Sequence, residues 1–516
     1  MILVKINLLT NEKWWGGNTS AGVQMPYAGF SENLLGKNRG NQSIPLLLSN
    51  RGRVVYSEEP FRFEFAGNEL QITDALGEVS LQAAGESLRD AYRYFVEHYA
   101  QPSGRIPDPL FFTQPQYNTW IELTYNQNEE DILRYARSLL EAGYPPGVMM
   151  IDDTWQEDYG VWEFSPRRFQ DPKSMMKELH AMGFKVMLWV CPFVSADSVE
   201  GRMLAREGAL VMEREKGEDI LWADTSNKAA PIRWWNGVSY CLDFSHPKAV
   251  AWFKGRLDYL QAQYDVDGFK FDAGDAPFYH DPKLAFHQDW HANQHTESFA
   301  RIAVDYPLNE LRACWKMANQ PLAQRLKDKR HLWDDLRELI PCMIAQGLTG
   351  YGFNCPDMIG GGEYQSFLRV DQVDQELFVR SAQASALMPM MQFSASPLRV
   401  LNPQHQSYCL EAAKLHFRLG AEILDLAKAC AQTGEPILRS MEYVFPGRDY
   451  AEVKDQFLLG DAILVAPVLE KGQESRMVHI PDGAWIRQDL DARLEGPLHA
   501  DLEVPLSNLC WFRREG

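Results

Sequence analysis

The stretch VDGFKFDAGD at residues 266–275 constrains the fold most, because it has the pattern of a short buried strand that ends in carboxylates. Its two phenylalanines fall on one face of such a strand, and Lys270 and Asp272 fall on the other. Gly274 then allows the backbone to turn away at once. In a parallel barrel the chemistry is built at the C-terminal ends of the strands, so Asp272 is the first candidate for a catalytic residue.

Between about residues 96 and 400, short apolar runs alternate with helical patterns. The runs at residues 148–153 (VMMIDD) and 184–192 (FKVMLWVCP) show no polar alternation, as expected for parallel strands covered by helices. Asn128 and Asp171 have the character of helix N-caps. Roughly eight strand-helix units fit into ~300 residues, which predicts an α/β fold with a (β/α)8 TIM barrel. A doubly wound sheet is the alternative.

The flanking parts of the chain have a different pattern. Residues 1–95 contain short alternating runs separated by turns, which predicts an N-terminal β domain. We place the catalytic barrel at 96–400, with an insertion near 205–240 over its mouth. A linking helix and a small C-terminal β-sandwich are expected in 401–516.

Composition and net charge limit the classes of partner that we expect for this protein. The chain has 516 residues and a formal net charge of −19, which disfavours nucleic acid and anionic membranes as partners. The N-terminus lacks a secretory signal pattern and no apolar stretch is long enough to cross a bilayer, so we expect a cytoplasmic protein. The eight cysteines contain no CxxC pair, so neither a zinc site nor a disulfide framework is expected. A homo-oligomer is left open.

Carboxylates recur where the predicted strands end. Asp152 and Asp153 follow one strand, Asp272 and Asp275 follow another, and Asp357 follows a third. Several tryptophans are expected near the same mouth: Trp120, Trp155, Trp189, Trp234 and Trp235. Aromatic rings stack on the apolar faces of sugars, and two carboxyl groups suffice to cleave a glycosidic bond. The alternative for any one of these acids is a helix cap or an ion pair.

Four motifs together resemble glycoside hydrolase family 31, the retaining α-glycosidases. They are MIDD at 150–153, DFSHP at 243–247, FKFDAGD at 269–275 and QFLLGDAILVAP at 456–467. They occur in the family's order, and the resemblance runs from about residue 45 to the C-terminus. It implies a small-molecule α-glycoside or oligosaccharide substrate and no metal or organic cofactor.

The resemblance also implies roles for individual residues. Asp272 would be the nucleophile that forms the glycosyl-enzyme. The family places its acid/base five residues before a tryptophan that opens a helix, which selects Asp328 ahead of Trp333. Arg312 falls on a substrate-binding arginine, and Asp152 falls on the acid that holds the outer hydroxyls of the sugar.

Other candidates for substrate binding have open alternatives. Lys270 is expected to favour the ionised form of Asp272. Asp153 is either a ligand or a loop cap, Trp189 a sugar platform or a core residue, and Asp357 a ligand or a support for the mouth. Trp234 and Trp235, in the insertion, are expected to contact the substrate.

Two departures from the family's α-glucosidases concern the sugar that is recognised. Cys191 stands where many of them have aspartate, and the segment ending at Ser394 lacks their histidine. Because a site without the partners of one epimer discriminates against it, glucose is disfavoured. The KFDAGD motif at 270–275, the WWNG insertion at 234–237 and CPDMIGGG at 355–362 resemble instead the family's α-galactosidases. Asp275 also stands where the family usually has glutamate.

The expected function is therefore a retaining, exo-acting α-galactosidase. An α-glucosidase, an α-xylosidase, an enzyme acting on N-acetylated galactose and a transglycosylase are the alternatives within the family. A catalytically silent sugar-binding protein is the alternative from another class.

Overall fold

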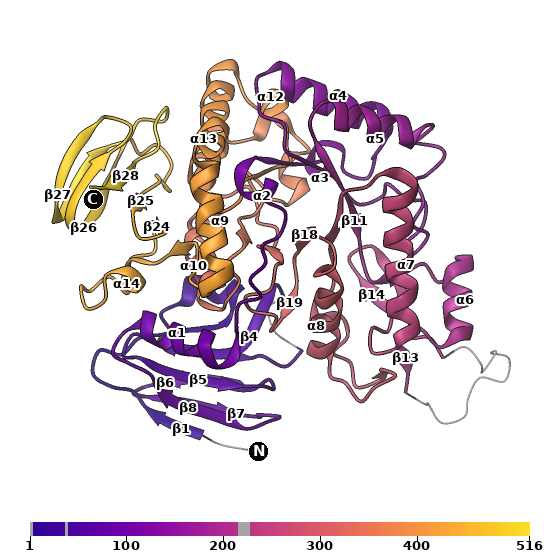
Figure 1. Ribbon diagram of the computed structural model, residues 1–516, viewed down its shortest axis with the longest axis horizontal. Helices are drawn as coiled ribbons and strands as arrows, with labels where there is room; N and C mark the ends of the chain where they lie inside the picture. The colour runs from indigo at the N-terminus through magenta and orange to yellow at the C-terminus, as the bar shows by residue number, and fades with distance from the viewer. Residues whose placement is uncertain (1–3, 37–39, 215–227, 516) are drawn as a thin grey trace.

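The computed structural model describes residues 4–36, 40–214 and 228–515. At its centre is a sheet of eight strands, each parallel to its neighbours (Figure 1). In spatial order the strands are β21 (Asn354–Cys355), β20 (Ala323–Arg325), β18 (Leu308–Leu311), β16 (Gly268–Phe271), β11 (Lys185–Val190), β10 (Val148–Ile151), β9 (Gln116–Asn118) and β22 (Gln392–Phe393). The amide of Ile359, just after β21, donates to the carbonyl of Gln392 at 2.8 Å, and this bond links the two ends of the sheet. The predicted TIM barrel is confirmed.

Helices lie around the outside of this barrel (Figure 1). The main ones are α4 (Glu129–Glu141), α5 (Pro172–Ala181), α7 (Pro247–Tyr264), α8 (Ala292–Ala303), α10 (Leu339–Leu348) and α11 (Gln375–Ala386). Shorter ones are α2 (Leu110–Thr113), α3 (Trp120–Leu123), α6 (Val199–Glu207), α9 (Trp333–Arg337) and α12 (Pro397–Val400). Asn128 and Asp171 cap α4 and α5, since their side chains accept hydrogen bonds from the amides of Asp131 and Ser174.

Strand β16 carries the expected division of side chains. Phe269 and Phe271 pack on residues of the helical layer, with Tyr306 and Phe299 among their ring contacts. Lys270 points the other way, into the barrel, where its Nζ bonds Asp152. Gly274 ends the segment at φ +156°, and a Cβ there would meet Phe299 at 2.5 Å. The turn after Asp272 therefore requires glycine.

One barrel strand escaped the sequence analysis. The three residues of β20, Ala323–Arg325, are two-thirds polar and follow β18 without an intervening helix, so neither apolar pattern nor spacing marks them. Between β18 and β20 the chain forms β19 (Cys314–Trp315), which pairs in parallel with β4 of the N-terminal region. Two sheets are thereby joined by the segment that connects the fifth and sixth barrel strands.

The N-terminal region forms two sheets below the barrel in Figure 1. One contains β1 (Val4–Asn7), β3 (Ser31–Asn33), β6 (Arg62–Ala66) and β7 (Glu69–Thr73); the other contains β2 (Trp14–Asn18), β4 (Gln42–Ser49), β5 (Arg53–Ser57) and β8 (Val79–Ala83) with β19. Helix α1 (Leu88–Tyr99) leads into the barrel and runs across the predicted boundary at residue 95. The β-rich character predicted for this region is what the structure shows.

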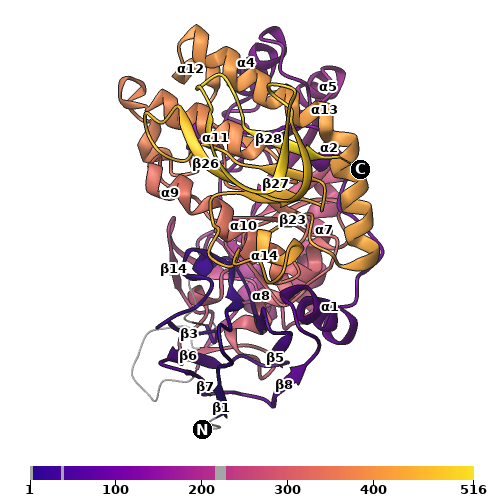
Figure 2. The same ribbon diagram turned by 90° about the vertical axis from the view of Figure 1, so that its left-hand side faces the viewer.

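The C-terminal region follows the long helix α13 (Pro403–Thr433) and the short helix α14 (Met441–Val444). Six antiparallel strands form one sheet: β23 (Leu438–Arg439), β24 (Phe457–Leu459), β25 (Ile463–Val465), β28 (Trp511–Arg514), β26 (Ser475–Arg487) and β27 (Ala492–Glu503) (Figure 2). A register shift interrupts the β26–β27 pairing between Ile480 and Gly483. Residues from both sides of it, including Ile480 and Trp485, belong to one buried core.

The insertion joins the mouth of the barrel through a small sheet of β12 (Phe193–Val194), β14 (Ile232–Trp234) and β15 (Gly237–Cys241). Another pairing joins β13 (Met212–Glu213) to β17 (Leu284–Ala285). The most charged part of the predicted insertion, 215–227, lies outside the described residues. Within the described ranges, no helix combines the length and the apolar character needed to cross a bilayer.

Candidate active site

A pocket of about 320 Å³ opens at the C-terminal ends of the barrel strands. Its size is in the range of pockets that hold small ligands. Eight of the ten residues predicted for the site line it: Asp152, Asp153, Trp189, Trp235, Lys270, Asp272, Arg312 and Asp328. They come from the ends of five barrel strands and from the insertion, so residues that are 176 positions apart in the sequence (152 to 328) meet in one place.

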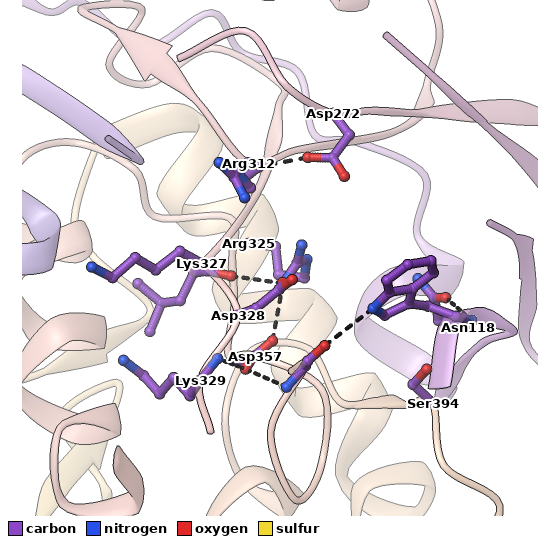
Figure 3. A network of polar contacts seen from close by, with 12 residues as sticks. Asn118, Asp272, Arg312, Arg325, Lys327, Asp328, Lys329, Asp357 and Ser394 are labelled. Atoms are coloured by element: carbon purple, nitrogen blue, oxygen red, sulfur yellow. Dashed lines mark hydrogen bonds and ion pairs between the residues drawn. The ribbon is translucent and has the colours of Figure 1, made fainter. Parts of the chain in front are cut away.

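Asp272 is held by groups on three elements. The indole Nε1 of Trp189, on β11, donates to Oδ2 at 2.9 Å, and the amide of Ala273 donates to Oδ1 at 2.8 Å. The guanidinium of Arg312 lies 3.6 Å from Oδ1 (Figure 3). Each contact fixes the rotation of the carboxylate, so one orientation is imposed before any ligand arrives.

The same surroundings keep Asp272 ionised. Burial acts to raise the pKa of its carboxyl, but the charges of Lys270, Arg312 and Arg325, together with the bond from Trp189, outweigh it and lower the pKa to about 2. A carboxylate with this pKa is a nucleophile or a charge stabiliser at any physiological pH, and it is not a proton donor.

Lys270 and Asp152 form a buried ion pair at the floor of the pocket. The Nζ and Oδ2 atoms are 2.7 Å apart, and less than 5% of either side chain is exposed. Burial acts to lower the pKa of Lys270, yet the charge of Asp152 raises it. Lys270 therefore stays charged, and both side chains line the pocket.

Asp153 is held differently from its neighbour. Its Oδ2 accepts hydrogen bonds from Asn236 at 2.6 Å and from the Tyr159 hydroxyl at 3.2 Å, whereas its buried Oδ1 has no hydrogen-bond partner among the described residues. Burial, and next the charge of Asp152, raise the pKa of Asp153 to about 7. Asp153 therefore changes its charge near neutral pH, and Oδ1 is free to bond a ligand.

Asp328 lies on the opposite side of the pocket with 36% of its side chain exposed. Its Oδ1 accepts a hydrogen bond from Nη1 of Arg325 at 2.8 Å. The same Nη1 donates to Oδ1 of Asp357 at 2.9 Å, and Arg325 Nε donates to Glu310 at 3.2 Å. Arg325 is 1% exposed, so one buried cation serves three carboxyl groups. Figure 3 shows Arg325 with two of them, Asp328 and Asp357.

Arg312 connects the pocket to the insertion and to the N-terminal region. Its guanidinium stacks over the ring of Trp235 at 4.7 Å and donates to Oδ2 of Asp275 at 2.7 Å. Asp275 Oδ1 in turn accepts from the amide of Asn41 at 2.9 Å. Asp275 thus orients Arg312 from behind, and Trp235, 45% exposed, forms the outer wall.

Two predicted ligands do not line the pocket. Trp234 is 5% exposed, stacks on Phe193 at 4.4 Å between ring centroids and donates from Nε1 to Ser239, so its place is in the core of the insertion. Asp357 is 3% exposed and accepts from the amides of Lys329 at 2.6 Å and Gly362 at 2.8 Å. The structure therefore places Asp357 as a support of the mouth, which was one of its two interpretations.

Trp189 is buried and contacts Asp272 through its ring nitrogen, so it acts as a hydrogen-bond donor rather than as an exposed platform. Other residues of the site were missed: Arg325, Glu310, Asn236 and Tyr159. Arg325 comes from β20 and Glu310 from β18, whereas Asn236 comes from the insertion and Tyr159 from a loop, and no local pattern marks them. A buried arginine three residues before the proposed acid was the one available signal.

The comparisons with known proteins agree with this geometry. The model of the glycosyl hydrolases family 31 TIM-barrel domain matches residues 114–419, and that of the glycosyl hydrolase family 31 C-terminal domain matches 434–516. The myogenesis-regulating glycosidase of Mus musculus is 32% identical over 443 residues, 83% of this chain and 60% of that protein. The 1,3-alpha-isomaltosidase of Kribbella flavida is 26% identical over 480 residues, 82% of this chain and 63% of that protein. The chain thus spans less than two thirds of the length of these relatives.

Solved structures show the same fold. The Flavobacterium johnsoniae GH31 dextranase complexed with glucose superposes with a TM-score of 0.87 at 19% identity, covering 100% of this chain and 66% of that one. A GH31 alpha-xylosidase from a soil metagenome complexed with xylose gives 0.84 at 21% identity, covering 99% and 79%. With family models over the barrel and the C-terminal region, and a relative above 30% identity, this chain belongs to glycoside hydrolase family 31.

Proposed function

We propose that this glycoside hydrolase cleaves α-glycosides by the retaining, exo-acting double displacement. The observation that carries the proposal is the pairing of two unlike aspartates in one pocket. Asp272 is buried and kept ionised by three cations, whereas Asp328 is one third exposed and lies where a leaving group would depart. A nucleophile and a proton donor are the two groups that this chemistry requires.

In the first step Asp272 attacks the anomeric carbon, and the bond from that carbon to the leaving oxygen breaks. Asp328 gives its proton to that oxygen, so the aglycone leaves as a neutral alcohol. In the second step a water molecule attacks the glycosyl-aspartate, Asp328 accepts the proton of the water, and Asp272 is released as a carboxylate. Two inversions return the α-anomer.

The shape of the pocket supports exo action. Asp153, Asn236 and Tyr159 close the side of the pocket beyond Asp152 through their mutual hydrogen bonds. We propose that the outer hydroxyls of the sugar meet Asp152 and Lys270 and that this hydrogen-bonded cluster bars a further ring in that direction. The sugar cleaved is therefore the terminal one.

For the sugar itself we propose an α-galactoside. Cys191 and Ser394, at the two positions that depart from the α-glucosidases, do not line the pocket: Cys191 is fully buried with its thiol near the Phe193 carbonyl, and Ser394 Oγ accepts from the Ile121 amide. Arg312 and Trp235 form a wall on the other side. A site that lacks partners for an equatorial hydroxyl favours the epimer with an axial one.

An α-glucoside or α-xyloside is the second candidate. It is supported by relatives named 1,3-alpha-isomaltosidase, alpha-xylosidase and alpha-glucosidase. Turnover of aryl α-galactoside, α-glucoside, α-xyloside and α-N-acetylgalactosaminide decides between the candidates, with NMR reading the anomer released first and Asp272→Asn as the blank. Early α-galactose supports the proposal, and preference for glucoside or xyloside overturns the galactoside assignment. Binding without turnover of any of the four would favour a silent sugar-binding protein.

A further inference from the structure

The positive charge of Arg325 is shared among three carboxyl groups. It is 1% exposed and contacts Asp328 and Asp357 through the same nitrogen, Nη1, at 2.8 and 2.9 Å. Its Nε contacts Glu310 at 3.2 Å. Three carboxylates around one guanidinium cannot all ionise without repulsion that is strong in a poorly solvated site. At least one of the three carboxyl groups is expected to hold a proton.

Asp328 and Asp357 differ in their access to water. The side chain of Asp328 is 36% exposed and lines the substrate pocket, whereas that of Asp357 is 2% exposed and lies behind it. The charged form of a carboxyl is costlier where water is absent. In the empty enzyme the proton is therefore expected on Asp357, the less hydrated of the two carboxyl groups.

Hydrogen bonds and close packing connect Asp357 to the loop that carries Asp328. Its Oδ2 accepts the amides of Lys329, next to Asp328, and of Gly362, which lines the pocket. A Cβ on Gly362 would approach Asp357 Oδ1 at 2.8 Å and Asp328 at 3.0 Å, so the two carboxyl groups and this glycine are packed together. A change in charge at one carboxyl is felt at the other.

We propose that Asp357 is a positioning residue for the acid/base, Asp328. The two carboxyl groups both contact Nη1 of Arg325 and share one proton, and Asp357 yields this proton to Asp328 when substrate covers Asp328. This inference rests on the proposed function. In the shift, the O–H bond of Asp357 breaks and an O–H bond forms on Asp328, so the net charge of the cluster is unchanged. Asp328 then gives that proton to the leaving oxygen.

The surrounding charges are compatible with this exchange. Those facing the pair are Arg325, Glu310, Lys270, Asp272 and Arg312, with Lys329 and Arg330 on the acid's own loop. Burial, followed by the charge of Asp328, raises the pKa of Asp357 to about 7, against the lowering effect of Arg325. The proton is thus held loosely enough to move near neutral pH.

The test compares two substrates whose leaving groups differ in their need for a proton. The comparison distinguishes a loss of proton delivery from a structural defect. Asp357→Asn is assayed on a methyl glycoside, whose leaving oxygen needs a proton, and on a 2,4-dinitrophenyl glycoside, whose leaving oxygen does not. We expect kcat/KM for the first to fall by about 10²-fold, and glycosylation by the second to change by less than about threefold. The pH profile on the methyl glycoside should also shift, and Asp328→Asn should show the same selectivity for leaving groups.

Glu12→Gln is the matched control, because Glu12 is also a buried carboxyl paired with an arginine, Arg53, but lies in the N-terminal region. It should affect neither substrate. If Asp357→Asn does not fold, Arg325→Lys replaces it, since an ammonium on a flexible stem lacks the planar fork that spans both carboxyl groups.

Equal losses of activity on both glycosides in a folded variant, or no loss on either, would contradict the proposal that Asp357 and Asp328 share a proton. Failure of the proposed function looks different: the wild-type protein would then turn over neither glycoside.

Discussion

The two sides of the pocket treat their carboxyl groups in opposite ways. On the nucleophile side Asp272 faces Lys270, Arg312 and Arg325 and accepts a bond from Trp189, so its charge is fixed and its pKa is about 2. On the acid side Asp328 and Asp357 share Arg325, and the pKa of Asp357 is about 7. A carboxyl group that is surrounded by several cations stays ionised, whereas carboxyl groups that share one cation can change their charge. Retaining hydrolysis needs one group of each kind.

The largest effect should come from removing Lys270, the cation beneath the nucleophile side. Lys270→Met leaves Asp152 buried without a partner, which typically costs about 3–5 kcal/mol of unfolding free energy. It also removes the strongest of the charges that lower the pKa of Asp272, so the acid limb of the pH-rate profile should move upward. Urea unfolding and the pH profile measure the two effects.

The double variant Lys270→Met with Asp152→Asn serves as the control, because it removes both charges and should recover most of the stability. Unchanged stability in the single variant would contradict the assignment of a buried ion pair.

A smaller effect is expected when Asp272 loses one of the hydrogen bonds that orient its carboxylate. Trp189→Phe removes the donor to Asp272 Oδ2, and a hydrogen bond to a charged group is worth roughly 1.5–3 kcal/mol. If this bond holds the carboxylate for attack, kcat/KM should fall about 10- to 100-fold. Trp162→Phe is the matched control, because Trp162 is equally buried but its Nε1 has no partner in the described protein. Equal losses in both variants would assign the effect to packing.

The last prediction concerns the change of stability with pH. The raised pKa of Asp153, about 7, means that the folded state keeps a proton that the unfolded chain releases above about pH 4. Its contribution to stability is complete below pH 4 and declines as the pH rises to 7, by at most about 1.4 kcal/mol per unit.

In Asp153→Asn this contribution to the pH dependence should be missing, so urea unfolding at pH 5, 6 and 7 should give a flatter profile than that of the wild type. Parallel profiles for the two proteins would show that Asp153 is not protonated in the folded state.

The parts of this site that lie in a strand pattern could be predicted from the sequence. Asp152, Lys270 and Asp272 follow or end apolar runs, and strand alternation gives the direction of their side chains. The same alternation explains the mistake over Trp234: it is the last residue of β14 and faces the core, whereas Trp235 begins the turn that reaches the pocket. Adjacent residues of an extended segment do not face the same way.

The partners of the buried carboxyl groups could not be predicted in the same manner. Arg325 lies on a strand of three residues, and Asn236 and Tyr159 approach Asp153 from segments 77 positions apart (159 to 236). Their role depends on tertiary distances that leave no local periodicity. The sharing of Arg325 by two carboxyl groups likewise appears only when β20 and the loop after β21 are brought together.

The central claim is that Asp272 is the nucleophile of a retaining enzyme, and trapping the glycosyl-enzyme tests it most directly. The protein is incubated with the 5-fluoro-α-glycosyl fluoride of the preferred sugar, digested, and mapped by mass spectrometry. The account predicts one added fluoroglycosyl group on Asp272, with loss of activity in proportion and no labelling of Asp272→Asn. A label on a different carboxyl group, or turnover that releases the β-anomer without any label, would contradict it.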